Sequence, residues 1–110
     1  MREFATGATR DDSDTKIDYD GFLSYPVIKR YGEYMHQHRI QADGKLRESD
    51  NWQAGIPEAE YRKSLFRHFM AVWGGSRNGK VDQDDLCAMM FNVCGMLHEV
   101  LKLESSGHKE

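Results

Sequence analysis

The sequence predicts an all-α fold: a small helical domain of three main helices with a long irregular N-terminal arm. Three observations favour this class. Apolar residues recur at helical spacing in three stretches, no stretch shows the alternation of a half-buried strand, and the first 20 residues contain few apolar side chains. With 110 residues, 39% hydrophobic and 30% charged, we expect one globular domain, close to the size at which a single core becomes self-sufficient.

The expected organisation has three parts. Residues 1–20 form an irregular arm, residues 21–104 the helical domain, and residues 105–110 a disordered C-terminal tail. The arm has few apolar side chains that could pack. It carries five closely spaced aspartates: Asp11, Asp12, Asp14, Asp18 and Asp20. A core of this size could gain from oligomerisation, so we expect a homo-oligomer.

The first helix is predicted to begin near Ser24, with the hydroxyl as N-cap and Pro26 in the first turn. Its apolar stripe comprises Val27, Ile28, Tyr31, Tyr34, Met35 and His38. Residues 43–55 are polar and contain glycine, which predicts a loop.

The second helix restarts at Pro57 and is predicted to stop at Gly74-Gly75. Its apolar face comprises Tyr61, Leu65, Phe69, Val72 and Trp73. The last helix runs from about Asp82 to Leu103, capped by Asp82 or Asp84. Its broad apolar face comprises Leu86, Met89, Met90, Val93, Leu97, Val100 and Leu101.

Charge and composition exclude several classes of partner. The net charge of −3 provides no basic field for nucleic acid. We expect no membrane anchor, because no signal peptide appears and no stretch approaches the ~20 apolar residues of a span. Cys87 and Cys94 lie seven residues apart in a helical pattern, where small buried hydrophobes are expected rather than a disulfide.

The stretch GGSRNGKVDQDD, residues 74–85, matches two site motifs in part. A P-loop needs a preceding strand and a hydroxyl after Lys80, where Val81 stands instead. A calcium loop needs an acidic first ligand and a glutamate at position 12, where Gly74 and Asp85 stand. We therefore interpret the stretch as a connector.

Polar side chains occur on or beside the apolar helix faces. Asn92 lies within FNVCGML, His68 at the edge of the second helix face, and His38 within the first. Each could be a satisfied core residue or could line a polar pocket between helices. His36 and His38 are a weak metal pair, because residues i and i+2 diverge on a helix.

The candidate binding side chains are mostly cationic and aromatic and less often acidic. Arginine and lysine bind phosphates and aromatic faces stack on bases. The residues of these types are Arg10, Lys16, Tyr19, Trp52, Arg67 and His68. Carboxylates for a magnesium site are sparse: Asp82-x-x-Asp85 is explained by capping, and Glu33 and Glu99 stand singly.

Several blocks of sequence in order resemble a known family. They are ATGATRDDSDTKIDYDGFLS, YGEYMHQHR, DNWQAGIP, SLFRHFMAVW and DDLCAMMFNVCGMLHE, which together extend over about residues 5–101. This pattern resembles the phage-rich family named for the N-terminal domain of phage dATP/dGTP diphosphohydrolases. The resemblance implies a phage-encoded protein that acts on purine nucleotides in the cytoplasm of the infected bacterial host. The matching positions are Gly7, Arg10, Lys16, Tyr19, Asn51, Trp52, Arg67, His68 and Asn92.

The chain departs from related all-α pyrophosphohydrolases, whose E-x-x-E and E-x-x-D carboxylates it does not display. Our first hypothesis is therefore a nucleotide-binding protein without a cofactor, a sponge that sequesters purine or cyclic nucleotide immune signals in counter-defence. Its ligand would contact Arg10, Lys16, Tyr19, Asn51, Trp52, Arg67, His68 and Asn92. The alternative is a Mg-dependent dATP/dGTP pyrophosphohydrolase with Asp85, Glu99 and Glu33 as metal ligands. A second alternative is a non-catalytic protein-interaction module.

Overall fold

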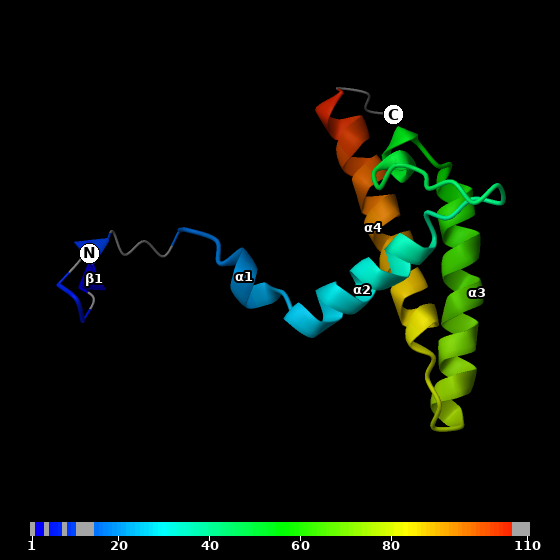
Figure 1. The fold of residues 1–110 in the computed structure, drawn as a ribbon, viewed down its shortest axis with the longest axis horizontal. Helices are drawn as coiled ribbons and strands as arrows, with labels where there is room; N and C mark the ends of the chain where they lie inside the picture. The colour runs from blue at the N-terminus through cyan, green and yellow to red at the C-terminus, as the bar shows by residue number, and fades with distance from the viewer. Residues whose placement is uncertain (1, 4, 8, 11–14, 107–110) are drawn as a thin grey trace.

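The fold is known from a computed structural model that describes residues 2–3, 5–7, 9–10 and 15–106. It confirms the all-α class: three main helices carry the structure, α2 (Tyr25–Gln37), α3 (Glu58–Arg77) and α4 (Gln83–Ser105). The smaller elements are β1 (Arg2–Glu3), β2 (Thr9–Arg10), α1 (Tyr19–Phe22) and the 3₁₀ helix η1 (Asn51–Ala54). Figure 1 shows α3 and α4 side by side, with α2 crossing α4.

The α3–α4 hairpin supplies the tightest packing in the fold. Tyr61 of α3 is 1% exposed and lies against α4 at Gly95. A Cβ on Gly95 would lie 2.3 Å from the Tyr61 ring, so glycine is what allows this approach. Tyr61 also makes an edge contact with Phe91, with ring centroids 5.7 Å apart.

The connector between α3 and α4 is shorter than predicted. Helix α3 does not stop at Gly74-Gly75 but continues to Arg77, and Gly79 (φ 75°) then reverses the chain. Gly75 stays within the helix because the returning chain packs on it: a Cβ there would lie 2.2 Å from the Lys80 carbonyl oxygen. This close contact requires a residue without a Cβ, and that requirement outweighs the low helix propensity of glycine. Asp82 then caps α4 as predicted, because its carboxylate accepts from the Asp84 amide at 2.8 Å.

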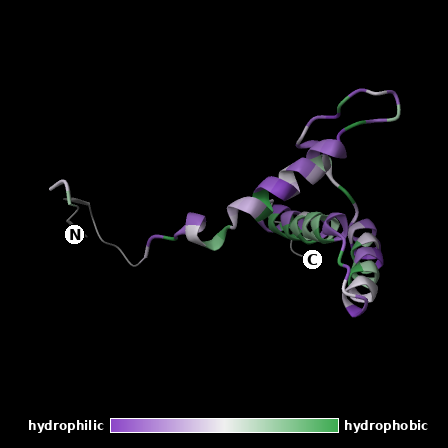
Figure 2. Cartoon of the chain, turned by 60° about the horizontal axis from the view of Figure 1, so that its bottom comes forward, coloured by the Kyte–Doolittle hydropathy of each residue, from purple (hydrophilic) through white to green (hydrophobic). Residues whose placement is uncertain are grey.

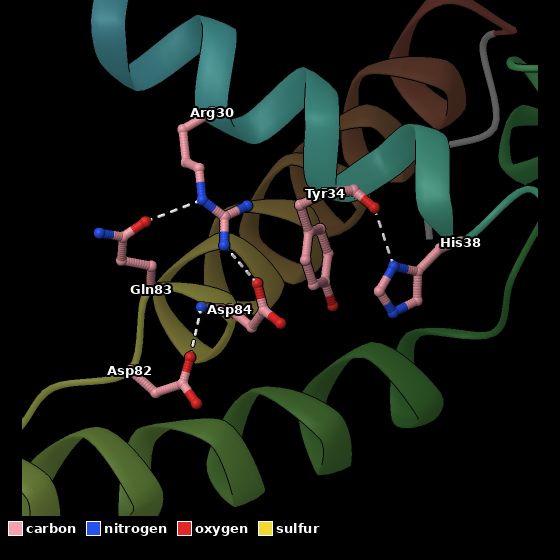
Figure 3. Close-up of polar contacts among 6 residues, drawn as sticks. All are labelled: Arg30, Tyr34, His38, Asp82, Gln83 and Asp84. Carbon is pink, nitrogen blue, oxygen red and sulfur yellow. Dashed lines mark hydrogen bonds and ion pairs between the residues drawn. The ribbon is translucent and has the colours of Figure 1, made fainter.

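Helix α2 begins after Ser24, as predicted, but the Ser24 side chain makes no capping hydrogen bond. One arginine fastens α2 to the start of α4. Arg30 donates from Nε to Gln83 Oε1 at 2.8 Å and from Nη2 to Asp84 Oδ1 at 2.5 Å (Figure 3). The hydrogen bond to Asp84 raises the pKa of Arg30 above its ordinary value. These contacts fix the crossing of α2 over α4.

The arm contains more regular structure than predicted. Strands β1 and β2 pair antiparallel, with Arg2 opposite Arg10, and Gly7 (φ 89°) lies in the turn between them. Helix α1 is capped by Asp18, whose carboxylate accepts from the Gly21 amide at 2.8 Å. Figure 1 shows the arm extending away from the three main helices. At the other end α4 reaches Ser105, and residues 107–110 of the predicted tail lie outside the described part of the chain.

The predicted apolar face of α4 is only partly buried, which corrects our expectation of a single closed core. Within the described residues, the buried apolar side chains are Tyr61, Cys87 and Ala88. Residues predicted for the core are instead about half exposed: Phe69, Trp73, Leu86, Val93, Leu97, Val100 and Leu101. Cys94 is also exposed, and both cysteines are free. The monomer therefore leaves much of its apolar surface in solvent.

By length and composition, helix α4 is long and apolar enough to cross a membrane. This differs from our expectation that no stretch would approach a membrane span. The apolar stretch of this helix is 22% buried. Figure 2 shows the hydrophobic colour concentrated on this helix. This is a weak indication, because core helices meet the same criteria.

Candidate functional site

A pocket of about 610 Å³ lies between α2, the loop that follows it, η1 and the middle of the α3–α4 hairpin. This volume is within the range of ligand sites in proteins. Its polar and aromatic lining comprises Tyr34, His36, His38, Arg39, Arg47, Glu48, Ser49, Asn51, Trp52, Ser64, His68, Phe91 and Asn92. The structure thus brings together four of the predicted ligand residues: Asn51, Trp52, His68 and Asn92.

Asn92 forms part of the pocket floor. Only 3% of the residue is exposed, and its Nδ2 donates to Ser64 Oγ of α3 at 3.0 Å. Its Oδ1 makes no hydrogen bond within the described part of the chain, and it is not among the buried side-chain oxygens that lack a partner, which are Tyr61 Oη and Glu99 Oε1. The Asn92 oxygen therefore keeps contact with solvent and can accept a hydrogen bond from water or from a donor in the pocket.

His68 forms a charge-assisted pair beside the floor. Its Nδ1 lies 2.7 Å from Asp85 Oδ1, and both side chains are partly buried. The carboxylate fixes the ring orientation and favours a proton on Nδ1. Nε2 is then the ring nitrogen available to a ligand or to water. Asp85 and Asn92, both on α4, therefore contribute to the pocket through these two contacts.

An aromatic wall faces this floor. The Trp52 ring contacts Phe91 at a centroid distance of 6.0 Å and His98 at 4.9 Å, both edge-to-face. Helix η1, which carries Trp52, is tied to α4 where Lys102 Nζ donates to the Gln53 carbonyl at 3.4 Å. Trp52 is half-buried, so part of the indole is open to the pocket.

Two arginines complete the rim, and our sequence reasoning missed both. Arg39 donates from Nε to the Arg47 carbonyl at 2.8 Å, and the Arg47 amide donates back to the Arg39 carbonyl at 2.8 Å. A turn at Gly44 (φ 82°) brings them together, and Ile40 and Leu46 form an antiparallel bridge inside it. The Asp43-Gly44 dipeptide, a hairpin signal, could have predicted this pairing.

Tyr34 and His38 border the pocket on α2. His38 Nδ1 lies 2.8 Å from the Tyr34 carbonyl oxygen, and the two rings are 4.1 Å apart (Figure 3). Burial raises the pKa of Tyr34 above its ordinary value. The phenol therefore stays neutral and can donate a hydrogen bond at physiological pH. Burial likewise raises the pKa of the neighbouring Tyr31, to about 12.

Other predicted ligand residues lie elsewhere. Lys16 and Tyr19 are exposed on the arm, and Arg67 is exposed on α3 without lining the pocket. Arg10 lies in β2, but its side chain is outside the described part of the structure. The eight predicted residues are thus divided among the pocket, the arm and, for Arg67, the exposed surface of α3.

The carboxylates of the hydrolase alternative each have a separate partner. Asp85 pairs with His68, Glu99 with Lys102 at 3.4 Å, and Glu33 with Lys29 at 2.5 Å. The hydrogen bond from Lys29 lowers the pKa of Glu33. Among the described residues, no group of three or more His, Cys, Asp or Glu side chains is placed to hold a metal ion. Glu99 keeps one buried oxygen, Oε1, without a hydrogen bond.

Comparison with known proteins identifies no relative of this chain. No protein-family model, curated protein or solved structure matches this chain. The resemblance to the phage diphosphohydrolase family therefore stays a prediction, and the pocket must be interpreted from its own chemistry.

Proposed function

We propose that this chain binds a purine nucleotide in the pocket and holds it without converting it. One observation carries the proposal: a single cavity combines an indole ring, two guanidinium groups and a buried amide. Each group matches a different part of a nucleotide. The match covers base, sugar and phosphate chemistry at once, which a simple apolar pocket would not offer.

The arginines would bind phosphate. Guanidinium groups are the side chains best suited to phosphate oxygens, because their planar donors can engage two oxygens at once. The Arg47 guanidinium makes no hydrogen bond or ion pair within the described part of the chain, so its donors are available. Arg39 uses Nε to hold the turn and keeps Nη2 for a ligand.

The floor and wall would hold the base. Trp52 offers aromatic surface for stacking, an interaction that contributes about 1–3 kcal/mol per base. The Asn92 Oδ1 would accept from an exocyclic amino group or a ring N–H of a purine. Glu48 at the rim would accept from a base or ribose hydroxyl in the same way.

The proposed biological role is sequestration in the cytoplasm of an infected host. The support is the resemblance to a phage family together with the separate partners of the three candidate metal ligands. A binder of this kind would act stoichiometrically, by lowering the free concentration of a purine or cyclic nucleotide signal.

The His68–Asp85 pair favours a second candidate, hydrolysis of a nucleotide. A histidine oriented by a carboxylate can accept a proton from water. Turnover must therefore be measured alongside binding, with and without Mg²⁺. If the chain releases pyrophosphate or phosphate from dATP or dGTP, its function is catalysis and not sequestration.

Isothermal titration with purine mononucleotides, triphosphates and cyclic dinucleotides tests the proposal, with pyrimidine counterparts for selectivity. Arg47→Ala should weaken binding about 10- to 100-fold, the loss of roughly 1.5–3 kcal/mol from a charged hydrogen bond. Arg67→Ala is the matched control: an exposed arginine outside the pocket, whose loss should leave affinity unchanged. Absence of heat with every nucleotide, or equal effects of the two variants, would refute the proposal and favour an interaction module.

A further inference from the structure

The surface opposite the pocket is apolar and uncovered. On α4 the exposed apolar residues Leu86, Val93, Leu97 and Val100 are 44–56% exposed. A helical wheel places them opposite Ala88, Asn92 and Gly95, which are buried. On α3 the exposed residues Phe66, Phe69 and Trp73 lie opposite the pocket-lining Ser64 and His68 in the same way.

Both stripes face away from the α3–α4 contact, because the residues opposite them meet across the hairpin: Ser64 bonds Asn92, and His68 bonds Asp85. The two stripes therefore lie on different outer sides of the hairpin. We call the α4 stripe the hairpin back. Charged residues lie at the ends of the hairpin: the Glu58–Arg62 pair at the start of α3 and Arg77 at its end. An apolar centre with a polar rim is the anatomy of a protein interface.

The amount of exposed surface indicates how large the missing contact is. The accessible surface is 9165 Å², whereas a folded monomer of this mass should expose about 6,200 Å². Obligate dimers bury about 1,000–2,500 Å² of each chain or more. The excess of about 2,900 Å² per chain, part of it on the arm, is therefore large enough to include such an interface.

The spacing on α4 indicates what kind of partner fits. Leu86, Met90, Val93, Leu97 and Val100 follow one another at intervals of four, three, four and three residues. This is the heptad spacing that packs a helix against another helix with the same seam. A second copy of α4 has that seam by definition, and a two-fold axis makes such a surface self-complementary.

A lipid bilayer fits this helix less well than a second copy does. Crossing a bilayer would expose the opposite face of α4 to lipid, and that face carries Asp85, Asn92 and Glu99. Asp85 and Asn92 are already bonded to His68 and Ser64 of α3. The apolar character of α4 is therefore confined to the hairpin back, as expected for a helix between two protein layers.

We propose that the hairpin back is covered by the hairpin back of a second copy of this chain, with α4 packed against its symmetry mate. The two copies of α4 then form the centre of the dimer, and each pocket lies on the other side of its α4 and stays open. The proposal does not depend on what the pockets bind.

Sedimentation equilibrium of the wild-type chain tests the proposal. The expected mass is an even multiple of 12.7 kDa, and Leu97→Glu should reduce it to the single-chain mass while far-UV circular dichroism keeps its helical signal. Ile40→Glu is the matched control, because Ile40 is 58% exposed against 56% for Leu97 and lies in the loop away from the hairpin back. It should keep the wild-type mass.

A single-chain wild-type mass at micromolar concentration, or an unchanged mass for Leu97→Glu, would overturn the proposal. So would a single-chain protein that cosediments with phosphatidylcholine vesicles through Leu97, which would assign the face to a membrane. If Leu97→Glu does not fold, the wild-type melting temperature decides: it rises with protein concentration for an assembly that dissociates on unfolding. A melting temperature independent of concentration would likewise contradict the assembly.

Discussion

Gly95→Ala is the most direct test of how closely α3 and α4 approach. The new methyl group would lie 2.3 Å from Tyr61 Cε1 and Cζ and 2.7 Å from the hydroxyl oxygen. Carbon atoms in van der Waals contact are about 3.5–4.0 Å apart. The methyl group must therefore displace the Tyr61 ring or separate the helices by more than an ångström. Tyr61 is 1% exposed, so the ring has no open space to enter.

Two opposing effects set the size of the change. Alanine is favoured over glycine in a helix by about 1 kcal/mol. Overpacking a tight core costs about 1–3 kcal/mol, and separating the helices also loosens the contact of Tyr61 with Phe91. The clash should win because Tyr61 is the central buried side chain of the hairpin. We expect a net loss of about 1–2 kcal/mol, or roughly 5–10 °C in melting temperature.

Thermal unfolding followed by circular dichroism at one fixed protein concentration measures this loss. Gly74→Ala is the control, because Gly74 is also helical but a Cβ added there would have no neighbouring atom within 4 Å. It should gain about 0.5–1 kcal/mol from helix propensity alone. If Gly95→Ala instead melts at or above the wild type, the close approach of α4 to the Tyr61 ring is wrong.

Two further predictions concern buried polar groups. Burial raises the pKa of Tyr31 from 10.0 to about 12, so its contribution to stability is complete below pH 10 and is lost as the pH rises to 12. Denaturation midpoints across this window, with tyrosinate absorbance, should show that loss, and Tyr31→Phe should flatten it; an identical pH profile for both chains would contradict the assignment. Asn92→Ala and Ser64→Ala should each destabilise the chain, with a coupling of about 1 kcal/mol in a double-mutant cycle. Strict additivity in urea denaturation would show that the two side chains do not bond.

Capping residues and apolar periodicity predicted the helices well, because these signals depend only on residues that are close together in the sequence. Ser24 precedes α2, Asp82 caps α4, and the apolar periodicity of α4 extends along the helix that forms. The prediction was wrong at Gly74-Gly75 for a non-local reason. The turn at Lys80 packs the returning chain onto Gly75, and that contact cannot be read from the propensity of two glycines.

Hydrophobic periodicity predicted only those residues of the candidate site that lie on helix faces. Periodicity placed Asn92 and His68 on inward edges, and both line the pocket. Arg39 and Arg47 are polar loop residues that meet only because a turn at Gly44 brings them together. Their convergence depends on backbone conformation, to which hydrophobic periodicity is insensitive.

The positions of the two tryptophans give this chain a built-in optical reporter and a reference. Trp52 borders the pocket, and Trp73 lies on α3 outside the pocket with half of its surface exposed. Indole emission depends on local polarity, so filling the pocket changes the emission of Trp52 and leaves that of Trp73 as a reference. A chain with Trp73→Phe would report ligand occupancy alone. Ligand binding can thus be followed by fluorescence without attaching a dye.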